Sequence, residues 1–307
     1  MAEITAKAVA ELRAKTGCGM MDCKRALKET GADFDAAVKY LRERGLAVAA
    51  KKADRIAAEG IVDIMKIGNT AAMIEVNSET DFVAKNADFQ NFVSDLLKTV
   101  INYRPSDISE LNAAKFVDTE HTVDAALKDK VFTIGENLNI RRFLITDGYT
   151  STYIHGKGQT GVIVKFDTDV NIASTEGFAE YSKNIALQVA ALPCLYVNRS
   201  DVPQSIIDEE KEILITQIKN DEANAKKPEA IIEKMVTGKI GKFFESNCLT
   251  EQQYVKDESM TIEKYTETVA KELGGSIKID SFYRYEKGEG LQKREDNFAE
   301  EIAGMIK

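Results

Sequence analysis

The chain has 307 residues, enough for two or more compact domains, and its 44% hydrophobic and 30% charged residues are ordinary for a globular protein. Its net charge of −9 argues against broad affinity for nucleic acid, because phosphate binding needs a concentrated positive surface. No apolar run approaches the roughly 20 residues that span a bilayer, and residues 1–15 lack the apolar core of a secretory signal. We therefore expect a cytoplasmic protein that contacts neither membrane nor nucleic acid.

The cysteines Cys18, Cys23, Cys194 and Cys248 are too few and too scattered for a disulfide framework. Cys18 and Cys23 have no second pair and no histidine beside them, as a zinc site would require. We expect all of them to be reduced thiols that act as small apolar groups, and we expect no bound metal.

The N-terminal segment predicts a small helical bundle. Helices are expected over residues 4–15, 20–31 and 34–45, the last capped by Asp33 and ended by Gly45, with a helical linker over 47–58. The basic cluster Lys51–Arg55 is small and interrupted by an acid, so it indicates a solvated linker.

Strand and helix patterns follow the bundle and occur twice. The first set predicts a β-hairpin at 60–67 and 71–76, a helix over 89–100 and a strand at 138–146. The second set predicts a hairpin at 151–155 and 161–166, followed by a helix over 176–191.

Two alignments support a duplication. GNTAAMIEV from Gly68 aligns with GQTGVIVKF from Gly158 at an offset of 90, and Ile140 aligns with Ile279 at an offset of 139. The two offsets imply a duplicated α/β lobe whose second copy carries an insertion of about 49 residues. Helical periodicity over 203–223 and 229–246 predicts that this insertion is an antiparallel helical hairpin, and residues 295–306 predict a C-terminal helix.

Candidate catalytic groups are scarce. His121 and His155 are the only histidines, which leaves little material for a nucleophilic triad. Residues 156–161 match GxGxxG, but a strand and not a helix follows, which favours a glycine-rich hairpin turn over a dinucleotide site. We expect no cofactor and no enzymatic activity. An enzyme of another type remains the alternative that this match would support, and binding of a nicotinamide nucleotide would reveal it.

Residues Thr80, Asp81, Phe82 and Val83 lie between a predicted strand and a predicted helix, where the second copy has 170–173. An acid beside an aromatic residue at a loop tip suits insertion into a partner protein. The residue pattern alone favours another interpretation, in which Phe82 packs under its own lobe and Thr80 or Asp81 caps the next helix.

TDFVAKN at residues 80–86 resembles the signature of the elongation factor Ts family, and further matches occur in the family's order. They are TGCGMMDCKRAL (16–27), IGENLNIRR (134–142), YIHG (153–156), KPEAIIEKMVTGKIGKFF (227–244) and RYEKGEG (284–290). The resemblance extends over essentially the whole chain.

The resemblance implies an α+β fold with several modules. These are a ubiquitin-associated-like (UBA-like) three-helix domain with its linker (1–54), a first core lobe (55–147), a second core lobe (148–290), and a C-terminal helix (291–307). Each lobe is expected to hold a small antiparallel sheet. The second lobe contains the helical-hairpin, coiled-coil insertion at about 200–249.

The resemblance also implies a guanine-nucleotide exchange factor that binds the GTPase elongation factor Tu and promotes GDP release, without binding nucleotide itself. Thr80, Asp81, Phe82 and Val83 are expected to displace elements that hold Mg²⁺ in the partner, and Ile134 and Gly135 to contact the same region. The remaining expected contacts are Arg13, Met20, Met21 and Lys24 in the bundle and His155 in the second lobe. A homodimer through the helical hairpin stays open. A rival interpretation, an RNA-associated or ubiquitin-like-fold adaptor, depends on the bundle and the Lys51–Arg55 linker.

Overall fold

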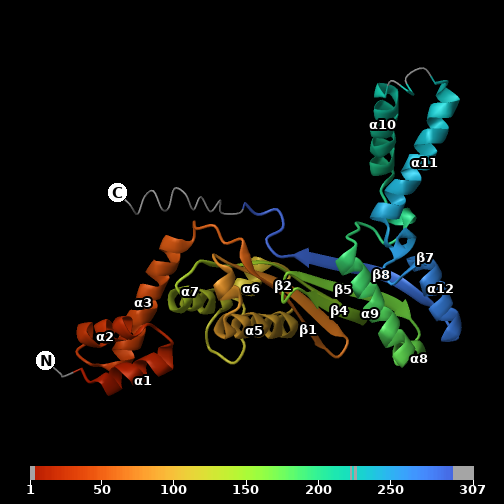
Figure 1. Cartoon of the computed structure of the whole chain (residues 1–307). Helices are drawn as coiled ribbons and strands as arrows, with labels where there is room; N and C mark the ends of the chain where they lie inside the picture. The colour runs from red at the N-terminus through yellow and green to blue at the C-terminus, as the bar shows by residue number, and fades with distance from the viewer. Residues whose placement is uncertain (1–3, 222, 225–226, 293–307) are drawn as a thin grey trace.

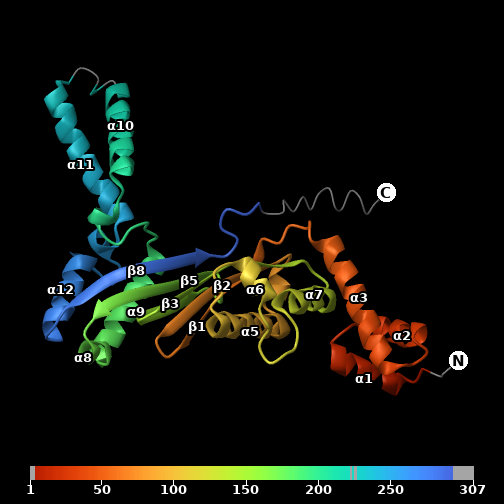
Figure 2. The same cartoon turned by 180° about the vertical axis from the view of Figure 1, so that it is seen from behind.

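The computed structural model describes residues 4–221, 223–224 and 227–292. A helical bundle lies at one end of the molecule, a body of two packed sheets in the middle, and a helical hairpin projects near the other end (Figures 1 and 2). The expected C-terminal helix over 295–306 lies outside the described residues. No helix within the described ranges is long and apolar enough to cross a membrane.

The bundle consists of α1 (Ala6–Thr16), α2 (Met20–Glu29) and α3 (Phe34–Lys52), as the sequence predicts for the first two. The prediction that the third helix ends at Gly45 is wrong, because α3 continues to Lys52 and includes the first half of the expected linker. Gly45 is buried against α7 (Val123–Ile134), and a Cβ added there would lie 3.4 Å from Phe132 Cβ. Gly45 therefore lets α3 pack closely against α7, and it does not end the helix.

Two three-stranded antiparallel sheets form the centre. One contains β1 (Glu59–Ile67), β2 (Thr70–Ser78) and β3 (Leu138–Asp147) in the order β1-β2-β3; the other contains β4 (Tyr149–His155), β5 (Thr160–Thr168) and β8 (Ile277–Glu286) in the order β4-β5-β8.

The strand pairing repeats with the offsets found in the sequence. Ile74 pairs with Phe143, and Val164, 90 residues after Ile74, pairs with Phe282, 139 residues after Phe143. The register shifts after Glu75 in the first sheet and after Lys165 in the second, which is again the equivalent position. The structure thus contains the duplicated α/β lobe that the sequence indicates.

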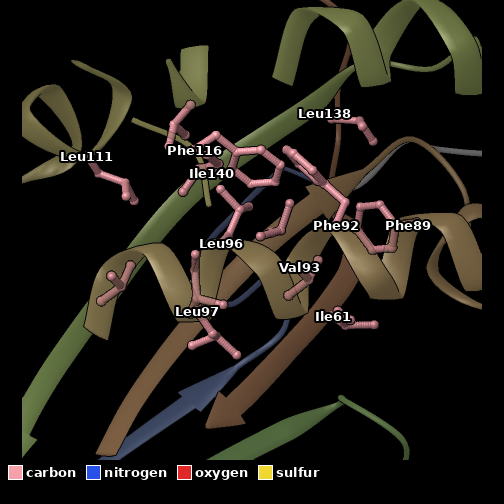
Figure 3. Close-up of a cluster of buried hydrophobic side chains, with 14 of the residues drawn as sticks. Ile61, Phe89, Phe92, Val93, Leu96, Leu97, Leu111, Phe116, Leu138 and Ile140 are labelled. Carbon is pink, nitrogen blue, oxygen red and sulfur yellow. The ribbon is translucent and has the colours of Figure 1, made fainter. Parts of the chain in front are cut away.

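The two lobes stack in four layers. Helix α5 (Ala87–Tyr103) covers the outer face of the first sheet, where Figure 3 shows its apolar side chains meeting residues of the strands, and α9 (Glu176–Ala191) covers the outer face of the second. The inner faces meet through the buried residues Val62, Met73 and Ile163. Because alternate residues of a strand point to opposite faces, β2 is buried on both sides.

A buried carboxylate joins the lobes at one end of this interface. The Glu75 side chain is completely buried and accepts hydrogen bonds from Arg141 Nη1 at 3.0 Å and Arg142 Nε at 2.6 Å. Gly288 N–H, from the segment after β8, donates to the same carboxylate at 2.8 Å, and Asn77 Nδ2 at 3.1 Å. One charge therefore organises contacts from three parts of the chain.

Further elements complete the lobes. Residues 104–137, expected only to connect a helix with a strand, contain α6 (Ile108–Ala113) and α7. The second lobe adds β6 (Gln253–Tyr254), β7 (Asp257–Thr261), α12 (Ile262–Glu272) and the short 3₁₀ helices η1 (Arg199–Asp201) and η2 (Leu249–Glu251). The insertion is the expected hairpin of α10 (Gln204–Asn220) and α11 (Glu229–Asn247), which pack through Leu214, Ile218, Ile232, Val236 and Ile240.

Candidate partner-binding surface

A single helical turn, α4 (Asp81–Ala84), presents the residues that the sequence singles out. Thr80 caps this turn, and its Oγ1 accepts the N–H of Val83 at 3.4 Å. Val83 is buried against the first lobe, whereas the Phe82 side chain is 80% exposed. The interpretation that Phe82 packs under its own lobe is therefore wrong. Thr80 caps the short turn α4, whereas the predicted helix that follows, α5 (Ala87–Tyr103), is capped by Asn86 and not by Thr80 or Asp81. Residues 80–83 are called the α4 tip below.

The α4 tip places an ionised acid beside the exposed ring. Lys85 Nζ donates to Asp81 Oδ2, and this hydrogen bond is the main cause that lowers the pKa of Asp81 below its ordinary value. The same ammonium lies 6.0 Å from the centre of the Phe82 ring. The exposed aromatic surface is thus next to a charged pair, a combination that can provide both contact area and register in a protein interface.

The second lobe has an equivalent turn, α8 (Val170–Ala173), with different chemistry. Ile172 is buried there as Val83 is in α4, which aligns Asn171 with Phe82. The α8 turn also lacks a side-chain cap from its preceding residue, Asp169. Of the two equivalent turns, only α4 exposes an aromatic ring.

Ile134 and Gly135 lie at the end of α7, and the structure brings this end to the α4 tip. Gly135 has φ of 88° and ends the helix, since glycine adopts this left-handed conformation without a steric penalty. Ile134 is half-buried against the core of the first lobe. The next residue, Glu136, hydrogen-bonds to Thr80 and so connects the two predicted groups.

The predicted bundle residues form a second group, on α1 and α2 at the N-terminal end of the molecule (Figure 1). Met20 and Met21 begin α2 and are 56% and 67% exposed, and Arg13 and Lys24 are exposed nearby on α1 and α2. Exposed methionines beside cations can contact an apolar and acidic partner surface.

His155 lies on a different element from both groups. It ends β4, is exposed, and its Nδ1 lies 3.1 Å from Tyr153 Oη. His155 pairs with Thr160 across the turn formed by 156–159, so the GxGxxG segment is a glycine-rich hairpin turn, as the sequence analysis favours. Gly156 and Gly158 both have positive φ in this turn, and no helix N-terminus follows that could hold a pyrophosphate.

Glu79 and Glu136 are residues at this surface that the sequence analysis did not identify. Each carboxylate accepts a backbone N–H from the segment of the other: Glu136 from Thr80 and Glu79 from Asn137. Residues Thr80 and Glu136 are 56 positions apart, and no local pattern pairs them. Only their proximity in the folded lobe reveals the contact.

The sequence of this chain matches known proteins over nearly its whole length, which includes all the residues described above. Residues 79–289 match the family model described as Elongation factor TS. Curated proteins called Elongation factor Ts from Syntrophotalea carbinolica, Clostridium kluyveri and Symbiobacterium thermophilum are 44%, 45% and 46% identical. The alignments include 99%, 99% and 98% of this chain and 100%, 99% and 98% of the respective relatives.

Proposed function

This chain belongs to the elongation factor Ts family, and from that premise we propose that it is a guanine-nucleotide exchange factor for the GTPase elongation factor Tu. It acts in the cytoplasm, during translation elongation, by contact and without catalysing a chemical reaction. The α4 tip inserts into the GTPase and displaces elements that hold Mg²⁺, which releases GDP. The 80% exposure of Phe82 on a fixed helical turn is the observation that carries this proposal.

The energetics of a buried ring support such a role. Moving a phenylalanine side chain from water into an apolar site stabilises a complex by about 1.5–3 kcal/mol. Since each 1.4 kcal/mol corresponds to a factor of about ten, Phe82 alone can favour the nucleotide-free complex by roughly ten- to a hundredfold. Binding is reciprocal: if the protein weakens GDP binding, GDP weakens binding of the protein by the same factor.

The other contacts follow from the family premise. In the proposal, Ile134 and Gly135 contact the same region of the GTPase as the α4 tip. Arg13, Met20, Met21 and Lys24 of the UBA-like bundle reach its phosphate-binding side, and His155 contacts another domain of the partner. The proposed contacts come from the bundle, the first lobe and the second lobe, so the protein contacts the GTPase at several points.

The coiled-coil hairpin is the proposed site of self-association. Ile213 and Ile231 remain 44% and 45% exposed on it, which leaves apolar surface for a second copy. Sedimentation of the full chain tests this; a monomer at all concentrations would exclude a homodimer.

The decisive experiment measures the release of a fluorescent GDP analogue from elongation factor Tu, with and without this protein. We expect strong acceleration by the wild type and a loss of at least about tenfold in Phe82→Ala, from the lost ring contact. Val170→Ala is the matched control, because Val170 is 66% exposed on the equivalent turn α8. It should exchange like the wild type.

Two outcomes would contradict different parts of the proposal. An absence of acceleration by the wild type would remove the exchange function altogether. Full activity in Phe82→Ala, with an unchanged circular dichroism spectrum, would remove only the insertion of the ring.

A further inference from the structure

We infer that Glu79 and Glu136 are positioning residues for nucleotide exchange, because their carboxylates fix the α4 tip against the segment that follows α7. This inference rests on the proposed function. The pair of carboxylates, called the carboxylate brace below, makes Asp81-Phe82 and Ile134-Gly135 one pre-organised contact surface.

Glu136 holds Thr80 through both of its oxygens. Oε2 accepts the Thr80 backbone N–H at 2.9 Å, and Oε1 accepts the Thr80 hydroxyl at 2.6 Å. A hydroxyl has one proton and two acceptor lone pairs. Since the proton is directed to Glu136, the lone pairs are left for the Val83 N–H, which lies 3.4 Å from the same oxygen. Glu136 therefore orients the group that caps the α4 turn.

Glu79 makes the reciprocal contact. Its Oε1 accepts the backbone N–H of Asn137 at 2.6 Å, and its side chain is only 16% exposed. Arg55 Nη1 lies 3.4 Å from the same oxygen and supplies a compensating charge. Each of the two segments thus provides a carboxylate to a backbone N–H of the other.

The segment after α7 is in turn fixed to the end of the bundle linker. Asn137 Nδ2 donates to the carbonyls of Ala53 at 3.2 Å and Arg55 at 2.8 Å, and Lys52 Nζ donates to the Gly135 carbonyl. The brace therefore attaches the α4 tip to a support that has several independent hydrogen bonds.

The brace matters for exchange because α4 is a single turn of four residues. A helix this short has no intrinsic stability in water, so its conformation depends on tertiary contacts. A tip that is disordered in the free protein must be ordered during exchange, and this cost lowers the rate. The brace removes this cost in advance, and the largest part of its effect on exchange passes through Phe82, the most exposed large apolar side chain of the α4 tip.

The test compares Glu136→Ala, Glu136→Gln and the control Glu251→Ala. Glu251 resembles Glu136 in holding a neighbour through both oxygens, here Arg199, but lies in the second lobe. At saturating protein, we expect Glu136→Ala to lower the maximal rate of GDP release about tenfold, as the loss of charge-assisted hydrogen bonds predicts. Glu136→Gln keeps one acceptor oxygen and should be intermediate, and Glu251→Ala should match the wild type.

Two further readouts separate positioning from a general structural effect. In the free protein, amide hydrogen exchange over residues 80–85 should become faster in Glu136→Ala, while α5 stays protected. In a Phe82→Ala background, Glu136→Ala should cause little further loss, because residues that act through one contact are not additive.

The outcomes distinguish this inference from the proposed function. If the wild type accelerates GDP release and Glu136→Ala does so equally, the brace has no positioning role. If Glu136→Ala lowered the rate of GDP release by the same factor in the wild type and in the Phe82→Ala background, the positioning role would also be refuted. If the wild type is inactive, the proposed function fails, and unchanged hydrogen exchange at 80–85 would then refute the brace independently.

Discussion

Replacing the buried Glu75 by glutamine tests whether one carboxylate joins the two lobes. The substitution keeps the size and shape of the side chain but removes its charge. In the wild type the carboxylate accepts hydrogen bonds from two arginines, from Asn77 and from the Gly288 N–H. An amide has a single acceptor oxygen and adds donors of its own, so Glu75→Gln leaves several of these groups without a partner.

The expected magnitude follows from the burial of each group. Removing one partner of a buried ion pair costs about 3–5 kcal/mol, and an unpaired buried donor costs about 1–3 kcal/mol. The side chains of Arg141 and Arg142 keep 21% and 28% exposure, so water can replace part of the lost interaction. We therefore predict a loss of about 2–4 kcal/mol in the free energy of unfolding.

Chemical denaturation of the full chain gives the measurement, with Asp147→Asn as the control. Asp147 also accepts hydrogen bonds from an arginine and a hydroxyl, but its pair with Arg104 is about half exposed. Such surface pairs contribute about 0–1 kcal/mol. If Glu75→Gln costs no more than Asp147→Asn, the reasoning about the buried carboxylate is refuted.

The dependence of the free energy of unfolding on pH below 4.5 provides an independent check of the role of Glu75. Burial acts to raise the pKa of Glu75, but hydrogen bonds led by the Gly288 N–H outweigh it and hold the pKa below the ordinary value of 4.5. A lowered native pKa means that the stabilisation is fully present above about pH 4.5 and is lost as the pH falls through the native pKa. The stability of Glu75→Gln should therefore depend less steeply on pH below 4.5 than that of the wild type.

Two further predictions concern packing and the thiols. Gly161→Val should destabilise the protein by about 1–3 kcal/mol in the same assay, because an added Cβ would lie 2.6 Å from Val62 Cγ1 between the sheets. Gly241→Ala is the control and should not destabilise the protein, because open space surrounds Gly241. Burial raises the pKa of Cys194 to about 12 and of Cys248 to about 11. At pH 8 we expect iodoacetamide to react with Cys248 roughly 100-fold and with Cys194 roughly 1,000-fold more slowly in native than in unfolded protein. Equal rates would contradict the burial of these thiols.

The repeated lobes were predictable because they depend on local patterns. Alternation and turn residues identify the hairpins, and the offsets of 90 and 139 relate the pairing of Ile74 with Phe143 to that of Val164 with Phe282. The bulges after Glu75 and Lys165 preserve this correspondence. Strand periodicity fixes which residues share a face, so the sequence contains most of the sheet register.

Features that depend on contacts between distant segments could not be predicted. Gly45 resembles a helix end in sequence, but its role is to admit Phe132 of α7. Phe82 resembles a core residue, yet Val83 and Ala84 occupy the inward positions of α4 and leave the ring outside. The role of Glu136 can be recognised only in the folded structure, where its carboxylate accepts the backbone N–H of Thr80. The residues of the α4 tip were found from family resemblance, whereas their support required the structure.

The stacking of the two sheets has a consequence for the order in which a nascent chain can fold. The inner face of β2 is covered by the second sheet, and that sheet is completed only by β8, at residues 277–286. A ribosome releases the chain from its N-terminus, so the first lobe emerges long before the strands that cover it. The bundle can form at once from local contacts, and β4 and β5 can cover the inner apolar face once they emerge, but the second sheet lacks its third strand until synthesis is nearly finished. Contacts between segments far apart in the chain form slowly, so we expect the pairing of β8 with β5 to be among the last steps of folding.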